Sequence, residues 1–267
     1  MTVPATSDIL VLKLGGSVLG ALPPAWWDDV ARLARRRPLV CVHGWSRPLA
    51  ELRERAGRET CFVISQNGHR SRLTDDSVLA DIAAVSAHLR AQIVARLAAR
   101  SVRAHGLVAA HDGLLEAAVR PQRWWVGSEL KAMDNKVGPI VAVARERMLA
   151  LLAAHAAIVV TPLARSPEHP LVNVDGDRAA ASIARALGAR DLVFATDVDG
   201  FLRDGSTIRR LGVAHVAAAV AESSGGMRKK LLAAADAVDG GVRCAAIGSA
   251  PVAELLAGRV GTQVVTT

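Results

Sequence analysis

Residues 9–20 read ILVLKLGGSVLG, in which a lysine stands near the end of an apolar run and is followed by two glycines. The run is short, partly β-branched and soon closed by glycine, which predicts a buried strand that opens into a tight turn. Backbone amides of a Gly-Gly turn can bind an anion, and Lys13 adds a full positive charge. Taken alone, an ordinary strand end with a glycine turn explains the stretch better, so the rest of the chain decides.

The spacing of this stretch fits neither common nucleotide-binding motif. The chain contains no G-x-x-x-x-G-K-[ST], and no G-x-G-x-x-G follows a strand. If an anion binds at Lys13, it is therefore bound by a glycine turn of another kind.

Composition predicts a globular protein with a large core. The chain has 267 residues, of which 51% are hydrophobic, enough for one large α/β domain or two lobes. Residues 1–8 lack a basic region followed by an apolar stretch, so we expect a cytoplasmic protein without a membrane partner. The three cysteines form no C-x-x-C, which indicates neither a disulfide framework nor a zinc site.

The net charge of +8 favours an acidic partner, because a positive field raises the encounter rate with anions and acidic proteins. Biased composition is an alternative explanation, since 28 of the 33 basic residues are arginine. Nucleic acid is disfavoured as a partner. Tyrosine is absent, and the dense basic runs, such as Arg35-Arg36-Arg37, are short and few.

Short apolar runs alternate with longer helical patterns along the chain. This alternation predicts an α/β fold, a three-layer αβα sandwich around a mostly parallel sheet. Ligands of such sheets bind at the carboxyl ends of the strands. We expect the segment 113–138 to be a hairpin or a mobile flap, and a lobe boundary near 162–170. The expected strands are 9–13, 39–43, 62–64, 157–161, 191–196 and 242–247, and the expected helices are 25–36, 46–57, 76–100, 178–188 and 227–239.

Two further stretches could bind anions. In VCVHGWSRP, residues 40–48, a strand ends at His43-Gly44 and a helix is expected to begin with Ser46 as its N-cap. His43 itself is better explained as a structural strand-end residue. In NGHRSRLTDDSV, residues 67–78, Arg72 could hold a carboxylate through two parallel hydrogen bonds, although without the other motifs a solvated loop arginine is the better explanation. Thr74 or Asp75 is the expected N-cap of the next helix.

Three stretches in the second half carry charged residues next to glycine. In LVNVDGDRAAA, residues 171–181, Asn173, Asp175 and Asp177 alternate, and we expect them to share one side of a short extended stretch. In LVFATDVDG, residues 192–200, a buried strand delivers Thr196 and Asp197 to a turn. In SSGGMRKKLL, residues 223–232, cations stand in the first turns of a helix, where they oppose the helix dipole unless an anion binds there.

Together these stretches resemble the amino acid kinase family over nearly the whole chain. The matching motifs, in order, are K-L-G-G-S, H-G, G-x-R-x-R-x-T-D, N-V-D-G-D-x-A-A, T-D-V-D-G and G-G-M-x-x-K. Within the family the chain is similar to the branch that contains acetylglutamate kinase and the kinase of amino-group carrier proteins, LysZ. The resemblance implies an N-terminal lobe, 1–165, for acceptor binding and dimerisation, and a C-terminal lobe, 166–267, for ATP binding.

Members of this branch phosphorylate the side-chain carboxylate of an amino-blocked acidic amino acid, giving an acyl phosphate and ADP. The resemblance implies that Lys13 and Lys230 stabilise the transferred phosphoryl group and that Asp177 orients both. It also implies a homodimer, and Mg²⁺ held mainly by the ATP phosphates without protein ligands. The same motifs imply three further sets of residues. Amides around the phosphate would come from Gly15, Gly16 and Gly44. The acceptor would be bound by Arg72, Asn173, Gly44 and Trp45, and the nucleotide by Lys13, Thr196, Asp197, Gly226, Met227 and Lys230.

The amine of the acceptor is blocked in this branch by an acetyl group or by attachment to an acidic, LysW-like carrier protein. NVDGDRAAA resembles the carrier-kinase form of its motif, and the charge of +8 suits an acidic macromolecule, so we expect the carrier. Trp45 replaces the second glycine of the usual H-G-G, which leaves acceptor specificity open. The alternatives are an acetylglutamate kinase of arginine biosynthesis and a non-catalytic relative that binds nucleotide or a partner. The pathway, whether lysine, arginine or a specialised metabolite, also stays open.

Overall fold

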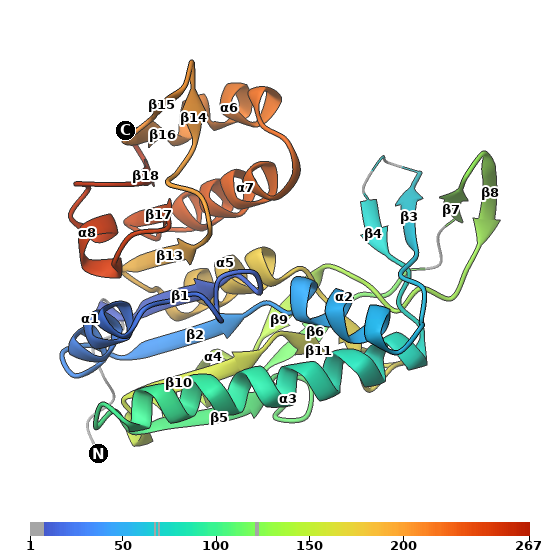
Figure 1. The fold of residues 1–267 in the computed structure, drawn as a ribbon, viewed down its shortest axis with the longest axis horizontal. Helices are drawn as coiled ribbons and strands as arrows, with labels where there is room; N and C mark the ends of the chain where they lie inside the picture. The colour runs from blue at the N-terminus through green and yellow to red at the C-terminus, as the bar shows by residue number, and fades with distance from the viewer. Residues whose placement is uncertain (1–7, 67, 69, 121–122) are drawn as a thin grey trace.

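The computed structural model of this chain describes residues 8–66, 68, 70–120 and 123–267 (Figure 1). Its centre is an eight-stranded sheet in which neighbouring strands are parallel, except for the antiparallel pair β17 and β18. The α/β fold with a mostly parallel sheet is therefore confirmed. In sheet order the strands are β16 (Arg210–Gly212), β18 (Thr262–Val265), β17 (Cys244–Gly248), β13 (Asp191–Ala195), β1 (Leu10–Leu14), β2 (Leu39–His43), β10 (Ala157–Thr161) and β5 (Ala104–Val108).

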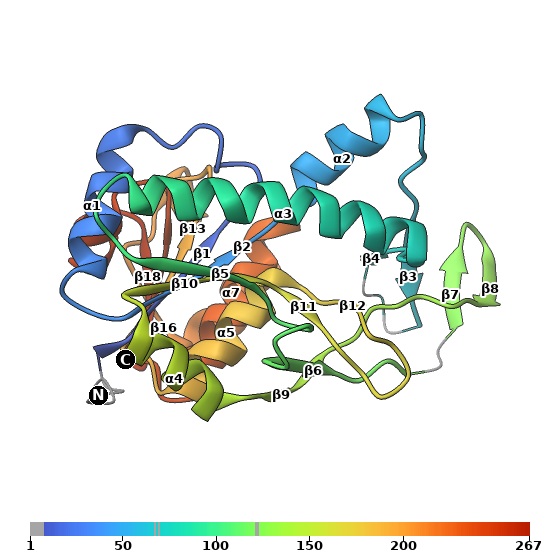
Figure 2. The same cartoon turned by 90° about the horizontal axis from the view of Figure 1, so that it is seen from below.

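Helices cover both faces of this sheet and form the outer layers of a three-layer sandwich (Figure 2). Helices α1 (Pro24–Ala34), α3 (Asp76–Ala98) and α8 (Val252–Leu256) pack on one face. Helices α4 (Arg145–Ala154), α5 (Gly176–Leu187), α6 (Val216–Glu222) and α7 (Gly225–Asp239) pack on the other. Each face has its own apolar core, because successive side chains of a strand point to opposite faces.

Strand β1 illustrates this alternation, which also determines the direction of the Lys13 side chain. Leu10, Leu12 and Leu14 belong to the core beneath α1 and α3, whereas Val11 belongs to the core beneath α5 and α7. Lys13 lies two residues after Val11 and therefore points to the same face. It reaches the carboxyl edge of the sheet beside the amino ends of α5 and α7.

Two predicted details at helix starts were wrong and one was confirmed. Helix α2 (Ser46–Arg55) has Trp45 as its N-cap residue, so Ser46 is already helical and does not cap. Asp177 lies in the first turn of α5 and shares no extended stretch with Asn173. Its neighbour Asp175 is the N-cap and accepts hydrogen bonds from the amides of Asp177 and Arg178, which starts the helix there. Asp75 caps α3 as expected.

A small second sheet projects from the carboxyl edge of the main sheet, at the right of Figure 1. Its strands run in the order β4 (Arg70–Arg72), β3 (Phe62–Ser65), β7 (Arg123–Val126) and β8 (Glu129–Ala132), all antiparallel. The hairpin of β7 and β8 confirms the hairpin expected within 113–138. The remaining elements are short: β6 (Leu115–Ala117), β9 (Ile140–Val143), β11 (Leu163–Ala164), β12 (Val172–Asn173), β14 (Leu202–Arg203), β15 (Ser206–Thr207) and η2 (Val213–His215).

Among the described helices, α3 alone is long and apolar enough to cross a membrane by length and composition. It runs along one face of the main sheet (Figure 2) and buries Val78, Ile82, Leu89 and Ile93 in the core. These apolar residues of α3 therefore pack against the sheet, as in the core helix of a globular protein.

Candidate active site

Three charged side chains far apart in the sequence meet at the carboxyl edge of the sheet. Lys13 Nζ lies 2.8 Å from Asp177 Oδ1, and Lys230 Nζ lies 3.5 Å from Asp177 Oδ2. Each of the three residues is less than a tenth exposed: 7% for Lys13, 6% for Asp177 and 9% for Lys230. Strand β1 and the first turns of α5 and α7 thus build one buried cluster, with two cations around one carboxylate.

The charges within this cluster depend on one another. Burial by itself raises the pKa of Asp177, but the ammonium groups of Lys13 and Lys230 outweigh it and lower this pKa below its ordinary value. Asp177 is therefore ionised at neutral pH. With both lysines protonated, the cluster carries one uncompensated positive charge in a region of low dielectric, where an anion would be strongly attracted.

Backbone comes close to both lysines because glycine stands beside them. A Cβ atom at Gly44 would lie 3.7 Å from Lys13 Nζ, and one at Gly226 would lie 3.7 Å from Lys230 Nζ. A Cβ atom at Gly16 would lie 3.0 Å from the carbonyl oxygen of Gly44, so the two glycine turns touch through their backbones. These glycines leave room beside the ammonium groups for a ligand.

The amides of these turns are not equally free. The Gly15 amide donates to the carbonyl of Ala195 at 3.1 Å, and the Gly44 amide donates to that of Leu14 at 2.8 Å. Both bonds join the ends of neighbouring strands. Within the described residues the Gly16 amide has no backbone acceptor, so it is the one of the three predicted amide donors that is available in this structure.

One cation in the first turns of α7, Lys229, has a protein partner that was not predicted from the sequence. Lys229 Nζ lies 3.1 Å from Asp175 Oδ2, beside the pair formed by Lys230 and Asp177. Two acids at the start of α5 thus face two bases at the start of α7. These ion pairs account for part of the unfavourable placement of cations at a helix N-terminus. Gly226 and Met227 lie in the first turn of α7, and Gly226 is exposed.

The predicted nucleotide side lies where β13 ends. Thr196 is buried, and its hydroxyl donates to the Asp197 carboxylate at 3.1 Å. Burial raises the pKa of Asp197, but hydrogen bonds from its own backbone amide, from Ser17 and from Thr196 outweigh this and lower it. Ser17 therefore links the glycine turn after β1 to the end of β13. The sequence carried no signal for this contact beyond the serine in K-L-G-G-S.

Two of the four residues predicted to bind the acceptor, Arg72 and Asn173, are joined through Thr74. Asn173 Nδ2 donates to Thr74 Oγ1 at 3.1 Å, and this hydroxyl donates to the carbonyl of Arg72 at 3.0 Å. Arg72 is half-buried, and its Nη1 is a buried atom that has no hydrogen-bond partner among the described residues. Burial lowers the pKa of Arg72, and Arg53 and Arg70 lower it further. An unpartnered guanidinium nitrogen in such a position is suited to binding an anion.

His43 and Trp45 flank Gly44 and are both buried. His43 Nε2 lies 2.8 Å from Thr161 Oγ1, which also accepts a hydrogen bond from Arg90 at 2.8 Å. Burial, followed by Arg90 and Lys13, lowers the pKa of His43 to about 3, so the ring is neutral at physiological pH. This agrees with the structural role expected for His43.

Trp45 is only 7% exposed and packs in the core beneath α3. Its φ of −134° is open to any residue, which explains why a glycine is not required there. Trp45→Gly is expected to destabilise the fold by about 3–5 kcal/mol, because a buried indole is removed and leaves a cavity. Urea unfolding of the variant measures this. A loss below about 1 kcal/mol would show that the indole is not part of the core.

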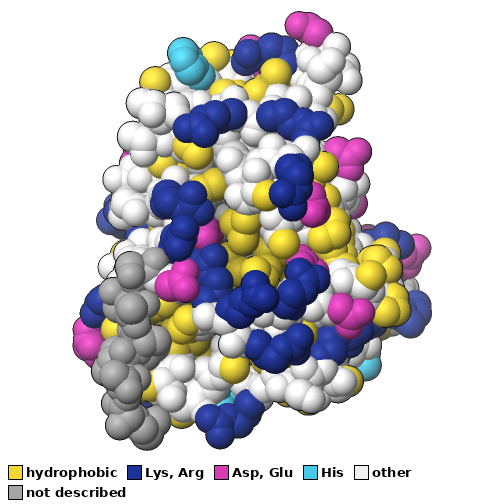
Figure 3. Space-filling view, turned by 90° about the vertical axis from the view of Figure 1, so that its left-hand side faces the viewer, with side chains coloured by type: hydrophobic (Ala, Val, Ile, Leu, Met, Phe, Trp, Pro, Cys, Tyr) yellow, Lys and Arg dark blue, Asp and Glu magenta, His cyan; other side chains and the backbone are white. Residues whose placement is uncertain are grey.

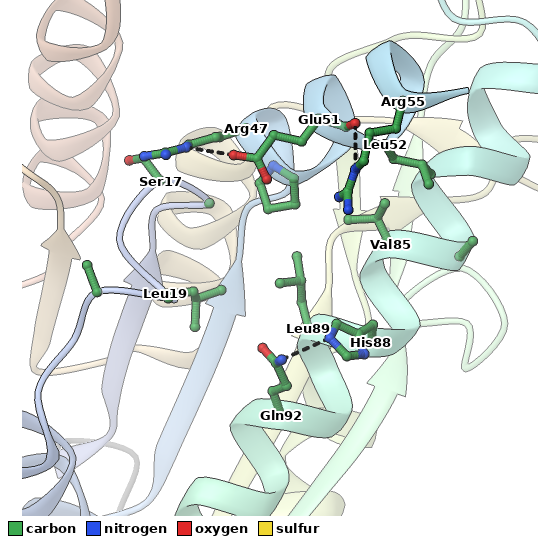
Figure 4. Close-up of a pocket in the computed structure, with 15 residues that line it drawn as sticks. Ser17, Leu19, Arg47, Glu51, Leu52, Arg55, Val85, His88, Leu89 and Gln92 are labelled. Carbon is green, nitrogen blue, oxygen red and sulfur yellow. Dashed lines mark hydrogen bonds and ion pairs between the residues drawn. The ribbon is translucent and has the colours of Figure 1, made fainter. Parts of the chain in front are cut away.

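A hollow of about 580 Å³ lies between the loop after β1, α2 and α3 (Figure 4). Its polar side chains bond to one another: Arg47 Nε lies 2.9 Å from Glu51 Oε1, and Gln92 Nε2 lies 2.8 Å from His88 Nε2. Gly16 and Ser17 form part of its wall, but the buried lysines and Asp177 do not line it. The hollow therefore adjoins the charged cluster through Gly16 but does not contain it.

Comparison with known proteins identifies the family. Residues 8–249 match the amino acid kinase family. The chain belongs to this family. A LysW-aminoadipate/LysW-glutamate kinase from Metallosphaera sedula is 30% identical over 96% of this chain and 100% of its own length. A relative from Aeropyrum pernix, provisionally given the same name, is 35% identical over 97% of this chain and 98% of its own.

Solved structures share the fold of this amino acid kinase at low sequence identity. The protein smu.665 from Streptococcus mutans superposes with a TM-score of 0.82 at 20% identity, covering 98% of this chain and 100% of the other. An N-acetylglutamate synthase from Neisseria gonorrhoeae gives a TM-score of 0.80 at 24% identity, covering 98% of this chain and 60% of the other. These likenesses establish the architecture alone.

Proposed function

We propose that this chain transfers the γ-phosphoryl group of ATP to the side-chain carboxylate of glutamate or aminoadipate attached to a LysW-like amino-group carrier protein. The buried cluster of Lys13, Asp177 and Lys230 is the observation that carries the proposal. It would supply two cations where charge develops during phosphoryl transfer. The product is an acyl phosphate on the carrier-bound amino acid, together with ADP.

The chemistry needs little beyond alignment and charge neutralisation. A carboxylate is already a nucleophile, so no general base has to remove a proton. ATP supplies the phosphoryl group, whose oxygens Lys13 and Lys230 would neutralise from the two sides of Asp177. Asp177 would fix the positions of both ammonium groups, and the Gly16 amide would add a hydrogen bond.

Other residues would bind the two substrates. Arg72 and Asn173 would bind the α-carboxylate of the acceptor and its surroundings, with Gly44 and Trp45 at the edge of that site. Thr196, Asp197, Gly226 and Met227 would lie along the nucleotide. Asp177 is occupied by two lysines, and no group of three acidic, histidine or cysteine side chains that could hold a metal occurs in the described part of the chain. As the resemblance implies, Mg²⁺ would be bound mainly by the ATP phosphates, since this ion usually takes few protein ligands in such sites.

Two observations favour a carrier-bound acceptor over free N-acetylglutamate. The relatives named above are kinases of LysW-linked substrates, and NVDGDRAAA follows the carrier-kinase form of its motif. The net positive charge is weaker support for a carrier-bound acceptor, because its Lys and Arg residues are not confined to one site. They are also spread over the face at the α1 end of the molecule, which is opposite the small sheet (Figure 3).

We also infer that the two halves of the main sheet have different functions. Residues 1–165, which contribute β5, β10, β2 and β1, would support acceptor binding and dimerisation. Residues 166–267, which contribute β13, β17, β18 and β16, would support ATP binding. The enzyme would act as a homodimer in the cytoplasm. A catalytically silent relative is disfavoured because both lysines and Asp177 are in place.

The proposal is tested by measuring ADP release with magnesium-ATP while hydroxylamine traps the acyl phosphate. The acceptors are a LysW-type carrier with a C-terminal glutamate, the same carrier with aminoadipate, and free N-acetylglutamate. Turnover that requires a carrier supports the proposal. Turnover with N-acetylglutamate alone would assign the chain to the acetylglutamate kinases, and no turnover with any acceptor would overturn the proposal.

Arg72 gives a separate test of the acceptor site. Arg72→Lys keeps the positive charge but removes the fork of hydrogen bonds, so KM for the acceptor is expected to rise about tenfold, or about 1.4 kcal/mol. KM for ATP should stay within about twofold. Steady-state kinetics with each substrate varied measures both constants, and an equal rise in the two KM values would contradict the assignment.

A further inference from the structure

One face of the small sheet collects exposed apolar side chains and arginines. Ile64 pairs with Arg70 on one side and with Trp125 on the other, and Phe62 pairs with Arg72. Directly paired residues of antiparallel strands, and residues two apart on one strand, point to the same face. Phe62, Ile64, Arg70, Arg72 and Trp125 therefore share one side, which we name the arginine–aromatic face.

This face is open, whereas the opposite face is largely packed. Phe62 is 43% exposed, Ile64 44% and Trp125 41%. On the other side of the same strands, Val63 is 2% exposed and Trp124 is 3% exposed. An apolar cluster of three large side chains on a projecting sheet is unusual for a surface that meets only water, and it is typical of a protein contact.

The arginines of this face are held next to its aromatic ring. The guanidinium carbon of Arg70 lies 3.6 Å from the centre of the Phe62 ring, and that of Arg72 lies 5.0 Å from it. Stacked guanidinium groups keep their in-plane N–H donors available for carboxylates. An acidic protein with an apolar patch matches both the chemistry and the arrangement of the face.

The face is also continuous with the proposed acceptor site. Strand β4 ends at Arg72, and the Arg72 carbonyl accepts the Thr74 hydroxyl, which in turn accepts from Asn173. A protein seated over Phe62, Ile64 and Trp125 would therefore lie beside Arg72. A short C-terminal segment of such a protein could enter the acceptor site directly.

We propose that the arginine–aromatic face docks the folded body of the acidic carrier protein, with Trp125, Ile64 and Phe62 as apolar anchors. The proposal rests on the carrier being the acceptor. It adds that the carrier is recognised locally, by these apolar side chains together with Arg70 and Arg72, and not only through the net charge of the chain. The contribution of the apolar anchors should therefore persist when salt screens the charges.

The test compares Trp125→Ser with Val126→Ser. Val126 is the next residue, is 38% exposed and points to the opposite face, so it is a matched control. The carrier with a C-terminal glutamate is the probe. Trp125→Ser is expected to raise KM for this carrier about tenfold or more, with kcat and KM for ATP within about twofold. Val126→Ser should leave all three constants within about twofold, and the difference between the variants should remain at about 0.5 M salt.

Calorimetric titration of the carrier into each protein separates this proposal from the proposed function. Weaker binding by Trp125→Ser alone supports docking on this face. Equal binding by wild type and Trp125→Ser, or equal loss in both variants, would overturn it, even if the wild type phosphorylates the carrier. Absence of carrier turnover by a wild type that binds the carrier through Trp125 would contradict the proposed function and leave the docking face supported.

Discussion

Lys230→Met is expected to lower kcat about 100- to 1,000-fold while the protein remains folded. Removing one fixed charge or hydrogen-bond donor from the site of charge development has effects of this size. Methionine has nearly the length of lysine and fills the same buried space without the charge. The measurement is the initial rate of ADP release with magnesium-ATP and the preferred acceptor, with circular dichroism to confirm the fold.

The matched control is Lys229→Met, one residue earlier on α7. Lys229 is exposed and pairs with Asp175, outside the buried cluster, so its kcat should change by less than about threefold. Similar losses in both variants would show that the two lysines act through the start of α7 and not through the phosphoryl group.

Asp177→Asn is expected to be the most destabilising conservative substitution in the site. It keeps the shape of the side chain but leaves two buried ammonium groups without a carboxylate, and removing one partner of a buried pair costs about 3–5 kcal/mol. The lysines also lose their fixed positions, so kcat should fall at least about 100-fold. Urea unfolding and initial rates measure the two effects.

The control here is Asp175→Asn, because asparagine caps a helix nearly as well as aspartate and the expected loss is below about 1 kcal/mol. The pH dependence gives an independent check. The pKa of Asp177 is lowered in the folded state, so its contribution to stability is present at neutral pH and is lost as the pH falls through that lowered value. The stability difference between wild type and Asp177→Asn should therefore shrink in acid. A difference that stays constant down to low pH would contradict the ion-pair account.

The central strands could be predicted because both of their faces are buried. Strands β1, β2, β10 and β13 are nearly unbroken apolar runs, as parallel strands between two helix layers are. Strand β5 was missed because it lies at the edge of the sheet and mixes His105 and Gly106 with its apolar residues. Helix α4 was missed because only two residues separate it from β10, so the two apolar patterns run together.

The charged cluster could be only partly predicted. Apolar periodicity and glycine turns indicated an anion-binding site near Lys13. They did not indicate that Asp177 and Lys230 would lie beside Lys13. The motif resemblance named these three residues, and the fold brings them together. It also placed Asp177 in a helix, because the Asp175 cap starts α5 one residue before it. The pairing of Lys229 with Asp175 depends on the packing of two helix starts, for which one sequence carries no local signal.

The central claim is that an acceptor carboxylate attacks the γ-phosphoryl group in the site formed by Lys13 and Lys230. Its most direct test uses carrier-bound glutamate whose carboxylates contain oxygen-18, incubated with unlabelled magnesium-ATP and then treated with hydroxylamine. Hydroxylamine attacks the carbonyl carbon of an acyl phosphate, so the released phosphate should carry one labelled oxygen and the carrier should become a hydroxamate. Unlabelled phosphate released with ADP, and an unchanged carrier, would show that water is the acceptor and would contradict the account.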